Sequence, residues 1–182
     1  MALRRVCHNT RMSKPSPSSA PSSRRYWLMK NEPETESIDH ALAAPHATLA
    51  WAGVRNYQAR NFMRDQMQVG DGVLYWHSGC AVPGIYGVAR IASAARVDPT
   101  QFDAASPYYD PRVSADKPRW LLVDVQALYK TLPVDMAALR ADPALAGMQV
   151  LQKGNRLSIT EVTPAQWEHL HATLLQSVDA AG

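Results

Sequence analysis

The sequence has few cysteines and lacks a long apolar run. Its 182 residues include only Cys7 and Cys80, so a disulfide framework is excluded and a reducing compartment is expected. No apolar stretch approaches the roughly 20 residues that a membrane span needs. We therefore expect a soluble, cytoplasmic protein that has no membrane partner.

The motifs that usually hold phosphates or metals are also missing. No Walker A or G-x-G-x-x-G pattern occurs, so ATP and dinucleotide chemistry lack their phosphate cradle. The six histidines show no H-x-x-x-H or H-E-x-x-H spacing, which zinc sites on helices use. The sequence therefore predicts no cofactor and no metal ion.

Acidic residues are absent from the first 25 positions, which hold six of the 19 basic residues. The remaining residues, 26–182, contain 13 Lys and Arg against 16 Asp and Glu and carry a formal net charge of −3. Prolines in the first stretch would break an amphipathic targeting helix, and the apolar region of a secretory signal is missing. We interpret residues 1–25 as a disordered, basic, Ser- and Pro-rich tail, unless translation starts at or beyond Met12. Residues 26–182 are interpreted as one folded domain.

Hydrophobic periodicity and turn residues divide this domain into short strands and short helices. Strands are predicted where aromatic and β-branched residues run between turns, at residues 25–30, 73–77, 84–97, 120–126 and 156–160. Helices are predicted at 38–44, 56–67, 133–146 and from 164 onward, capped by Ser37, Asn56, Asp135 and Thr163. The proline-rich stretch 98–118 is expected to be an ordered functional loop. Because no βαβ spacing repeats, the pattern indicates an α+β fold, a mixed β-barrel with flanking short helices.

One segment, which starts at Trp51, is dense in aromatic and polar side chains and indicates a flat polar ligand. Trp51 or Tyr57 could stack on a planar heterocycle for about 1–3 kcal/mol, while Arg55 or Asn56 reads its polar edge. Glu32 could accept a hydrogen bond from an exocyclic amine such as that of cytosine. Each residue also has a structural explanation: the tryptophan in the core, the asparagine as a helix cap, the arginine in solvent. On the residues alone, both explanations stay open.

His77 and Cys80 carry the alternative of a catalytic function. A cysteine nucleophile needs a nearby imidazole, but no acidic residue that would orient it and no Gly-Gly turn for an oxyanion hole accompany this pair. We therefore favour a protein that is not an enzyme. The alternatives are a sensor or enzyme for a small, nucleoside-like metabolite that uses His77 and Cys80, and a scaffold domain with a vestigial pocket. Alternation along the strand predicts Trp76 in the core with Tyr75 and His77 on the opposite face.

Several motifs occur in an order that a known family shares. They are Trp27-Leu-Met-Lys-Asn-Glu-Pro33, Trp51-Ala-Gly-Val-Arg-Asn-Tyr-Gln-Ala-Arg-Asn61, Tyr75-Trp-His-Ser78, Pro83-Gly-Ile-Tyr-Gly87, Tyr109-Asp-Pro111, Trp120 with Val123-Asp-Val-Gln126, and Arg156-Leu-Ser158. Together they resemble the EVE domain family of the PUA-like superfamily, from Tyr26 to about Leu170. The chain departs from the family at Asn31, where a serine is usual, and at Ala52, where a charged residue is frequent.

The resemblance implies a PUA-like mixed β-barrel with flanking short helices and a non-catalytic pocket for a modified nucleobase. The implied ligand is a modified cytosine, methylated or hydroxymethylated, and the expected partner is nucleic acid, in particular DNA. We expect a cytoplasmic monomer with access to the nucleoid. A patch of Arg55, Arg60 and Arg64 would add contacts to phosphates. By position, the pocket residues would be Lys30, Asn31, Glu32, Trp51, Arg55, Asn56, Tyr57, His77 and Ser78, with Tyr109 closing the pocket from the loop.

Overall fold

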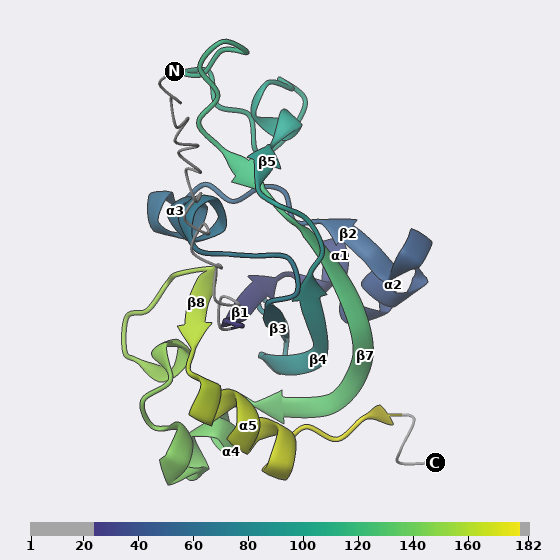
Figure 1. Ribbon diagram of the computed structural model, residues 1–182, viewed down its shortest axis with the longest axis vertical. Coiled ribbons are helices and arrows are strands. Elements are labelled where there is room, and N and C mark those ends of the chain that lie inside the picture. The colour runs from purple at the N-terminus through teal and green to yellow at the C-terminus, as the bar shows by residue number, and fades with distance from the viewer. Residues whose placement is uncertain (1–23, 179–182) are drawn as a thin grey trace, which may run out of the picture.

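The computed structural model of the protein describes residues 24–178, whose strands form a six-stranded sheet and a two-stranded sheet (Figure 1). The order of the larger sheet is β2-β7-β4-β3-β1-β8. In it, β1 and β3 run parallel, and all other neighbours run antiparallel. The strands are β1 (Tyr26–Asn31), β2 (Thr48–Ala50), β3 (Gly72–His77), β4 (Gly84–Ile91), β5 (Arg96–Val97), β6 (Leu121–Leu122), β7 (Asp124–Asp135) and β8 (Ile159–Val162), with β5 and β6 forming the smaller sheet.

Short helices lie in the connections between these strands and after β8. They are α1 (Pro33–Glu36), α2 (Ile38–Ala43), α3 (Tyr57–Asp65), α4 (Met136–Ala141) and α5 (Pro164–Thr173), with 3-10 turns at η1 (Pro45–Ala47), η2 (Pro99–Gln101), η3 (Pro143–Leu145) and η4 (Gln149–Leu151). All four predicted caps are confirmed, because each side chain accepts a hydrogen bond from a backbone N–H in the first helical turn. These caps are Ser37, Asn56, Asp135 and Thr163.

The arrangement confirms a mixed α+β class. In residues 24–178 the order of the larger sheet has two ends, at β2 and β8, so the pairing does not describe a closed barrel. Strand β7 curves along the sheet (Figure 1), pairs with both β2 and β4, and shifts its register against β4 in two places. Because such irregularities bend a strand, one sheet wraps around part of the core without closing on itself.

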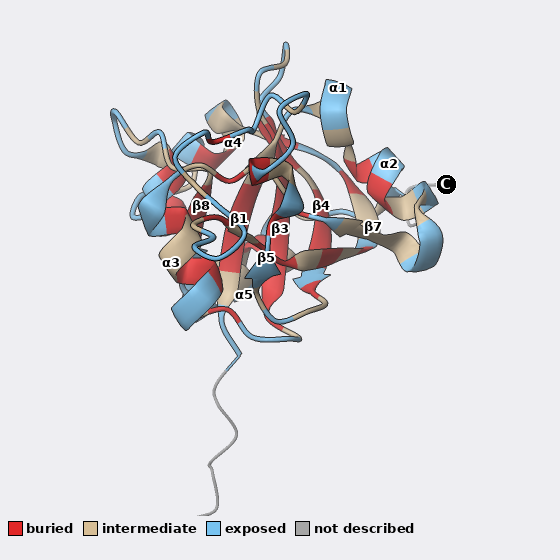
Figure 2. Cartoon of the chain, turned by 90° about the horizontal axis from the view of Figure 1, so that it is seen from above, coloured by how far each residue is buried: buried red, intermediate tan, exposed pale blue. Residues whose placement is uncertain are grey.

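The sheet separates two apolar cores, and its central strands are buried on both faces (Figure 2). Along β3, Val73 and Tyr75 face the core that α3 covers, whereas Leu74 and Trp76 face the core that α4 and α5 cover. The predicted alternation is therefore correct. The expectation that only Trp76 lies in the core is wrong, because Tyr75 is fully buried as well.

Three predicted strands and one predicted helix differ most from the structure; the helix predicted at 133–146 is shortened to α4, which is followed by η3. The strand predicted at 84–97 divides into β4 and β5, and the strand predicted at 156–160 begins only at Ile159. The strand predicted at 120–126 divides into β6 and a long β7, which ends at Asp135 and so takes the first three residues of the predicted helix. Gly84 permits this extension, because a Cβ at that position would overlap the carbonyl oxygen of Val134 on β7. The sequence-based prediction used only local preferences of the chain, so it could not include this contact between β4 and β7.

Of the predicted tail, residues 1–25, only Arg24 and Arg25 belong to the described part of the chain. The backbone N–H of Arg25 donates to the carboxylate of Asp71 at 3.1 Å. In the described range, no helix is long and apolar enough to cross a membrane.

Candidate functional site

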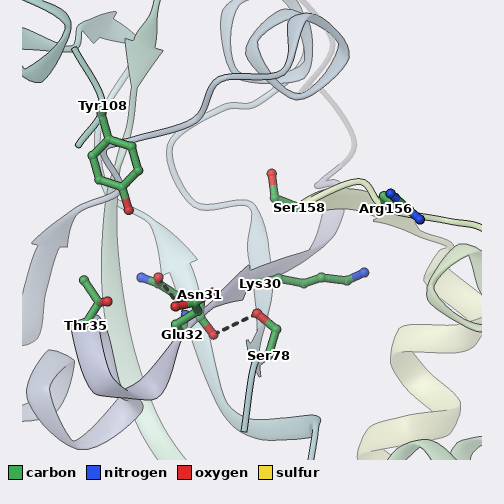
Figure 3. A pocket seen from close by; sticks show the side chains of 8 residues that line it. All are labelled: Lys30, Asn31, Glu32, Thr35, Ser78, Tyr108, Arg156 and Ser158. Carbon is green, nitrogen blue, oxygen red and sulfur yellow. Dashed lines mark hydrogen bonds between the residues drawn. The ribbon is translucent and has the colours of Figure 1, made fainter.

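Two adjoining cavities open where β1 and β3 end. The larger, of about 340 Å³, is lined by Lys30, Asn31, Glu32, Thr35, Ser78, Tyr108, Arg156 and Ser158 (Figure 3). The smaller, of about 120 Å³, is lined by Lys30, Asn31, Trp51, Ala52, Gly53, Val54, Arg55, Tyr108 and Ser158. Since β1 and β3 are parallel and pair Asn31 with His77, the residues that follow both strands leave the sheet at the same edge. Four residues line both cavities, so the two form one candidate site.

Lys30 brings a charge without a counterion to this site. Its backbone N–H donates to the carbonyl of Ser158 at 2.8 Å, which pairs the end of β1 with the segment before β8. Its side chain is partly buried, and no carboxylate of residues 24–178 lies within ion-pairing distance. Burial lowers the pKa of the Lys30 ammonium, because desolvation disfavours the charged form.

Asn31 and Glu32 differ in how much of their hydrogen-bonding capacity is used. The amide of Asn31 donates to Glu36 at 2.9 Å, and its oxygen accepts from the backbone N–H of Glu32 at 2.9 Å. Burial raises the pKa of Glu36, partly offset by this hydrogen bond from Asn31. The exposed carboxylate of Glu32 has no hydrogen bond or ion pair with the described chain. Glu32 is therefore free to accept a hydrogen bond from a ligand.

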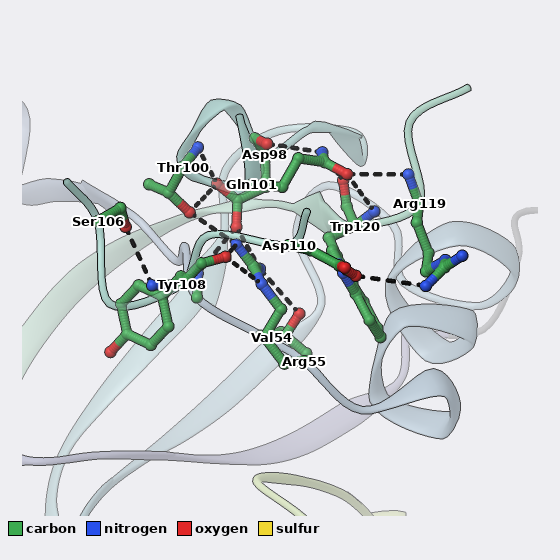
Figure 4. Close-up of polar contacts among 11 residues, drawn as sticks. Val54, Arg55, Asp98, Thr100, Gln101, Ser106, Tyr108, Asp110, Arg119 and Trp120 are labelled. Atoms are coloured by element: carbon green, nitrogen blue, oxygen red, sulfur yellow. Dashed lines mark hydrogen bonds and ion pairs between the residues drawn. The ribbon is translucent and has the colours of Figure 1, made fainter. Parts of the chain in front are cut away.

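Arg55 holds the long loop in place (Figure 4). Its guanidinium donates to the carbonyl of Tyr108 at 2.8 and 2.6 Å, to Asp98 at 2.8 Å and to the hydroxyl of Thr100 at 2.9 Å. Burial alone would raise the pKa of Asp98, but hydrogen bonds from Thr100, Arg55 and the N–H of Gly53 hold it below its usual value. Arg55 lines the smaller cavity, but its donors are already used within the protein.

Tyr108 is the aromatic residue that the loop brings to the site. Its ring packs so closely on Gly53 that a Cβ there would lie 2.6 Å from Cζ of the tyrosine. Figure 3 shows the hydroxyl of Tyr108 directed toward Asn31 and Thr35. Tyr109, predicted to close the pocket, is 44% exposed and lines neither cavity. Both tyrosines are in the sequence pattern, and only the loop conformation distinguishes them.

The predicted wall of residues 51–57 is divided between different surroundings. Trp51 is buried and lines the smaller cavity, and its ring lies edge-on to that of Tyr75 with the ring centroids 5.2 Å apart. The side chain of Asn56 caps α3 by accepting two backbone N–H groups. Tyr57 is 52% exposed and lines neither cavity, and its ring packs on that of Trp120 with the ring centroids 5.1 Å apart. The structure therefore brings only part of this segment to the site.

His77 and Cys80 have separate partners. The Nε2 atom of His77 accepts from the backbone N–H of Ile38 at 3.0 Å, and its ring stacks on Tyr86 at 4.2 Å. Burial lowers the pKa of His77. The thiol of Cys80 donates to the carbonyl of Val82 at 3.4 Å. Neither residue lines the cavities, and within residues 24–178 no group of three His, Cys, Asp or Glu could hold a metal ion.

The prediction that three arginines form a patch for phosphates is wrong for two of them. Arg55 pairs with Asp98 at 2.8 Å and Arg64 with Asp65 at 2.7 Å, so these two charges are neutralised locally. Arg60 lies over the ring of Tyr57 at 4.9 Å and has no ion pair in the described chain. The patch therefore offers one unpaired guanidinium rather than three.

The sequence identified four residues of the larger cavity and missed four others. Lys30, Asn31, Glu32 and Ser78 line it as predicted by position. The residues missed are Thr35, Tyr108, Arg156 and Ser158. Two of these, Arg156 and Ser158, stand in a motif that resembles the family, and the antiparallel pairing of β8 with β1 brings that motif to the site.

Comparison with known proteins supplies a family and solved relatives. A family model described as the EVE domain matches residues 25–173. Human thymocyte nuclear protein 1 is 46% identical over 110 residues, which are 56% of this chain and 48% of the human protein. The chain thus matches about half the length of that relative.

Two crystal structures have a similar fold. A protein from Pseudomonas putida has 43% sequence identity and a TM-score of 0.77, with 81% of this chain and 97% of that chain covered. The human THYN1 protein in complex with 5-methylcytosine containing DNA has 37% identity and a TM-score of 0.75, with 81% and 96% covered.

Proposed function

The chain belongs to the EVE domain family, and from this premise we propose that it is a non-catalytic module that binds a modified cytosine in DNA. The observation that carries the proposal is the free carboxylate of Glu32 at a cavity of about 340 Å³. This volume is near the lower end for ligand sites, about 300–1,000 Å³, and suits one base rather than a large cofactor. The human relative with a similar fold was solved with 5-methylcytosine containing DNA, which supports the ligand class.

Glu32 supplies the base-reading group. A carboxylate accepts a hydrogen bond from the exocyclic amine of cytosine, whereas thymine presents a carbonyl at the same position and repels it. The ring of Tyr108 forms one wall against which the base lies, and buried Trp51 supports the neighbouring smaller cavity. The base reaches this site unpaired or flipped from the duplex, because a base that is stacked within the helix cannot enter the cavity.

The partners of His77 and Cys80 support a module without catalysis. The Nε2 atom of His77 is occupied by the N–H of Ile38, and the thiol of Cys80 bonds to a backbone carbonyl. A nucleophilic pair needs the thiol and the imidazole within hydrogen-bonding reach of each other.

We also propose that the curved sheet is the PUA-like barrel of the family in an incompletely paired form.

The test compares one short oligonucleotide in three forms, with 5-methylcytosine, cytosine or thymine at one unpaired position. We expect 5-methylcytosine to bind about fourfold more tightly than cytosine, as one buried methyl group contributes about 0.8 kcal/mol. Thymine carries the same methyl group without the amine, and we expect it to bind about 5- to 150-fold more weakly, or about 1–3 kcal/mol. Equal affinity for all three would overturn base reading.

The variant Glu32→Gln tests whether Glu32 is the residue that recognises the exocyclic amine of the base. Its amide can donate to the carbonyl of thymine, so we expect the preference for 5-methylcytosine over thymine to shrink while the fold is unchanged. Glu34→Gln is the matched control, because Glu34 is exposed on α1 and lines neither cavity. An equal loss of preference in both variants would contradict the role of Glu32.

A further inference from the structure

The larger cavity has a second end that base reading leaves unexplained. Lys30 reaches it from β1, and Arg156 and Ser158 reach it from the segment before β8 (Figure 3). The hydrogen bond from the Lys30 N–H to the Ser158 carbonyl fixes these two segments together at 2.8 Å. Figure 3 shows Lys30 extending toward the side where Arg156 lies, with Ser158 between Arg156 and Tyr108 and with Glu32 on the other side of the strand end.

Neither cation at this end has a counterion. Among residues 24–178, no carboxylate lies within ion-pairing distance of Lys30 or Arg156. This contrasts with Arg55 and Arg64, each of which has a carboxylate partner at 2.8 Å or less. Lys30 is partly buried and Arg156 is exposed. A partly buried charge without a partner costs free energy, and the unpaired guanidinium beside it adds positive charge at the same cavity, so the two cations together indicate an anionic ligand.

We propose that Lys30, Arg156 and the hydroxyl of Ser158 form a phosphate subsite, so that the cavity takes a nucleotide unit with its phosphate and not a base alone. The inference rests on the proposed function for the identity of the base. The ammonium supplies charge, the guanidinium supplies a fork of donors, and the hydroxyl donates a further hydrogen bond. The subsite supplies locally the attraction for phosphate that the net acidic domain lacks overall.

The spacing of the two ends suits one nucleotide. Glu32 directly follows β1 and keeps extended backbone angles, φ −86° and ψ 125°. Residues two apart in an extended chain lie roughly 7 Å apart. Lys30 and Glu32 both line the larger cavity, so they can contact opposite ends of one ligand. A base at Glu32 therefore places the phosphate of the same nucleotide near Lys30.

The experiment removes the phosphate charge from the ligand and the cation from the protein. Oligonucleotides with an unpaired 5-methylcytosine carry a neutral methylphosphonate at the 5′ linkage, the 3′ linkage or, as a control, a linkage three nucleotides away. Each is titrated against the wild-type chain, Lys30→Met and Arg156→Gln. The matched protein control is Lys153→Met, since Lys153 is exposed close to Arg156 in sequence but does not line the cavity. Circular dichroism verifies that each variant is folded.

We expect a methylphosphonate at one of the two adjacent linkages to weaken wild-type binding about tenfold or more, the effect of losing a charge-assisted hydrogen bond. The distant linkage and Lys153→Met should change affinity by much less. Lys30→Met and Arg156→Gln should bind the all-phosphate DNA more weakly and lose most of their sensitivity to the adjacent methylphosphonate. Equal sensitivity in wild type and both variants would overturn the phosphate subsite.

Two further outcomes separate this inference from the proposed function and identify the source of the phosphate. If wild type prefers no base but keeps the variant-dependent methylphosphonate effect, base reading fails while the phosphate subsite stands. Titration with 5-methyldeoxycytidine monophosphate and its nucleoside gives the second outcome. If the nucleotide binds as tightly as the oligonucleotide, the subsite takes a free nucleotide, and if it binds far more weakly, the subsite takes a phosphate within a strand.

Discussion

The end of β1 and the segment from Trp51 to Tyr57 are both rich in polar and aromatic groups, but the structure uses them differently. In the segment, Arg55 donates to Asp98, Thr100 and the loop backbone, and Asn56 caps α3. At the end of β1, Lys30 and Glu32 have no ion pair in the described chain. Polar groups that remain without protein partners mark where a ligand is expected, whereas groups that are already bonded within the protein stabilise the elements around the site.

This difference assigns distinct roles to the two regions. Substitutions in the segment from Trp51 to Tyr57 should lower stability and displace the loop that carries Tyr108. Substitutions at Lys30 and Glu32 should change ligand binding with little loss of stability. Substitutions at Asp98, Arg55 and Lys30 test this contrast, and His77 at the neighbouring end of β3 adds a pH-dependent effect.

Removal of the Asp98 carboxylate should have the largest effect. Asp98→Ala leaves Arg55 without its ion pair and removes the acceptor of the Gly53 and Thr100 N–H groups. Breaking a buried pair on one side costs about 3–5 kcal/mol, so we expect a loss of that size in the free energy of unfolding in urea. Asp116→Ala, at an exposed position of the same loop, is the control and should change little. A similar, small effect of both would contradict the support role of Asp98.

Replacement of the Arg55 fork should have the next largest effect. Arg55→Lys keeps the charge but cannot satisfy Asp98, Thr100 and the Tyr108 carbonyl together. We expect a loss of about 2 kcal/mol in the free energy of unfolding, the range of hydrogen bonds to charged groups. Arg64→Lys changes an exposed pair and should cost less than about 0.5 kcal/mol. If the two variants were equally stable, Arg55 would not anchor the loop.

His77 should make stability depend on pH. Because burial lowers its pKa below 6.5 in the folded chain, the unfolded chain takes up the proton first as the pH falls. The contribution of the neutral His77 side chain to the free energy of unfolding is present above pH 6.5. It declines as the pH falls below 6.5, by less than about 1.4 kcal/mol per pH unit. Urea unfolding at pH 7.5 and 5.5 should therefore show a smaller pH effect in His77→Gln than in wild type. An unchanged pH effect would show that His77 is protonated equally in both states.

Lys30→Met should raise stability while it weakens binding. The substitution removes a partly buried charge whose pKa is lowered by desolvation and keeps an unbranched side chain of similar length. We expect a gain of about 0.5–1 kcal/mol in the free energy of unfolding, typical when a functional group is replaced by one suited to packing. Lys153→Met, which removes an exposed charge, should leave stability nearly unchanged. A loss of stability in Lys30→Met would mean that Lys30 is structural.

The features that the sequence predicted best are local ones. The caps at Ser37, Asn56, Asp135 and Thr163 depend on a side chain and the N–H groups a few residues later, so they can be recognised from spacing. The length of β7 could not be predicted in this way, because it depends on Gly84 in another strand.

The candidate site shows the same limit. Resemblance by position identified Lys30, Asn31, Glu32 and Ser78, which follow two paired strands. It chose Tyr109 over Tyr108, because adjacent residues on a loop are distinguished only by backbone direction. It also included His77 and Asn56, because the sequence does not reveal whether a polar atom is already bonded to the backbone.

The most direct test of the central claim is a structure of the chain bound to an oligonucleotide with one unpaired 5-methylcytosine. The account predicts that the exocyclic amine of the base donates to the Glu32 carboxylate and that Arg55 keeps its bond to Asp98. A base stacked on exposed Tyr57, with Glu32 still in solvent, would contradict it.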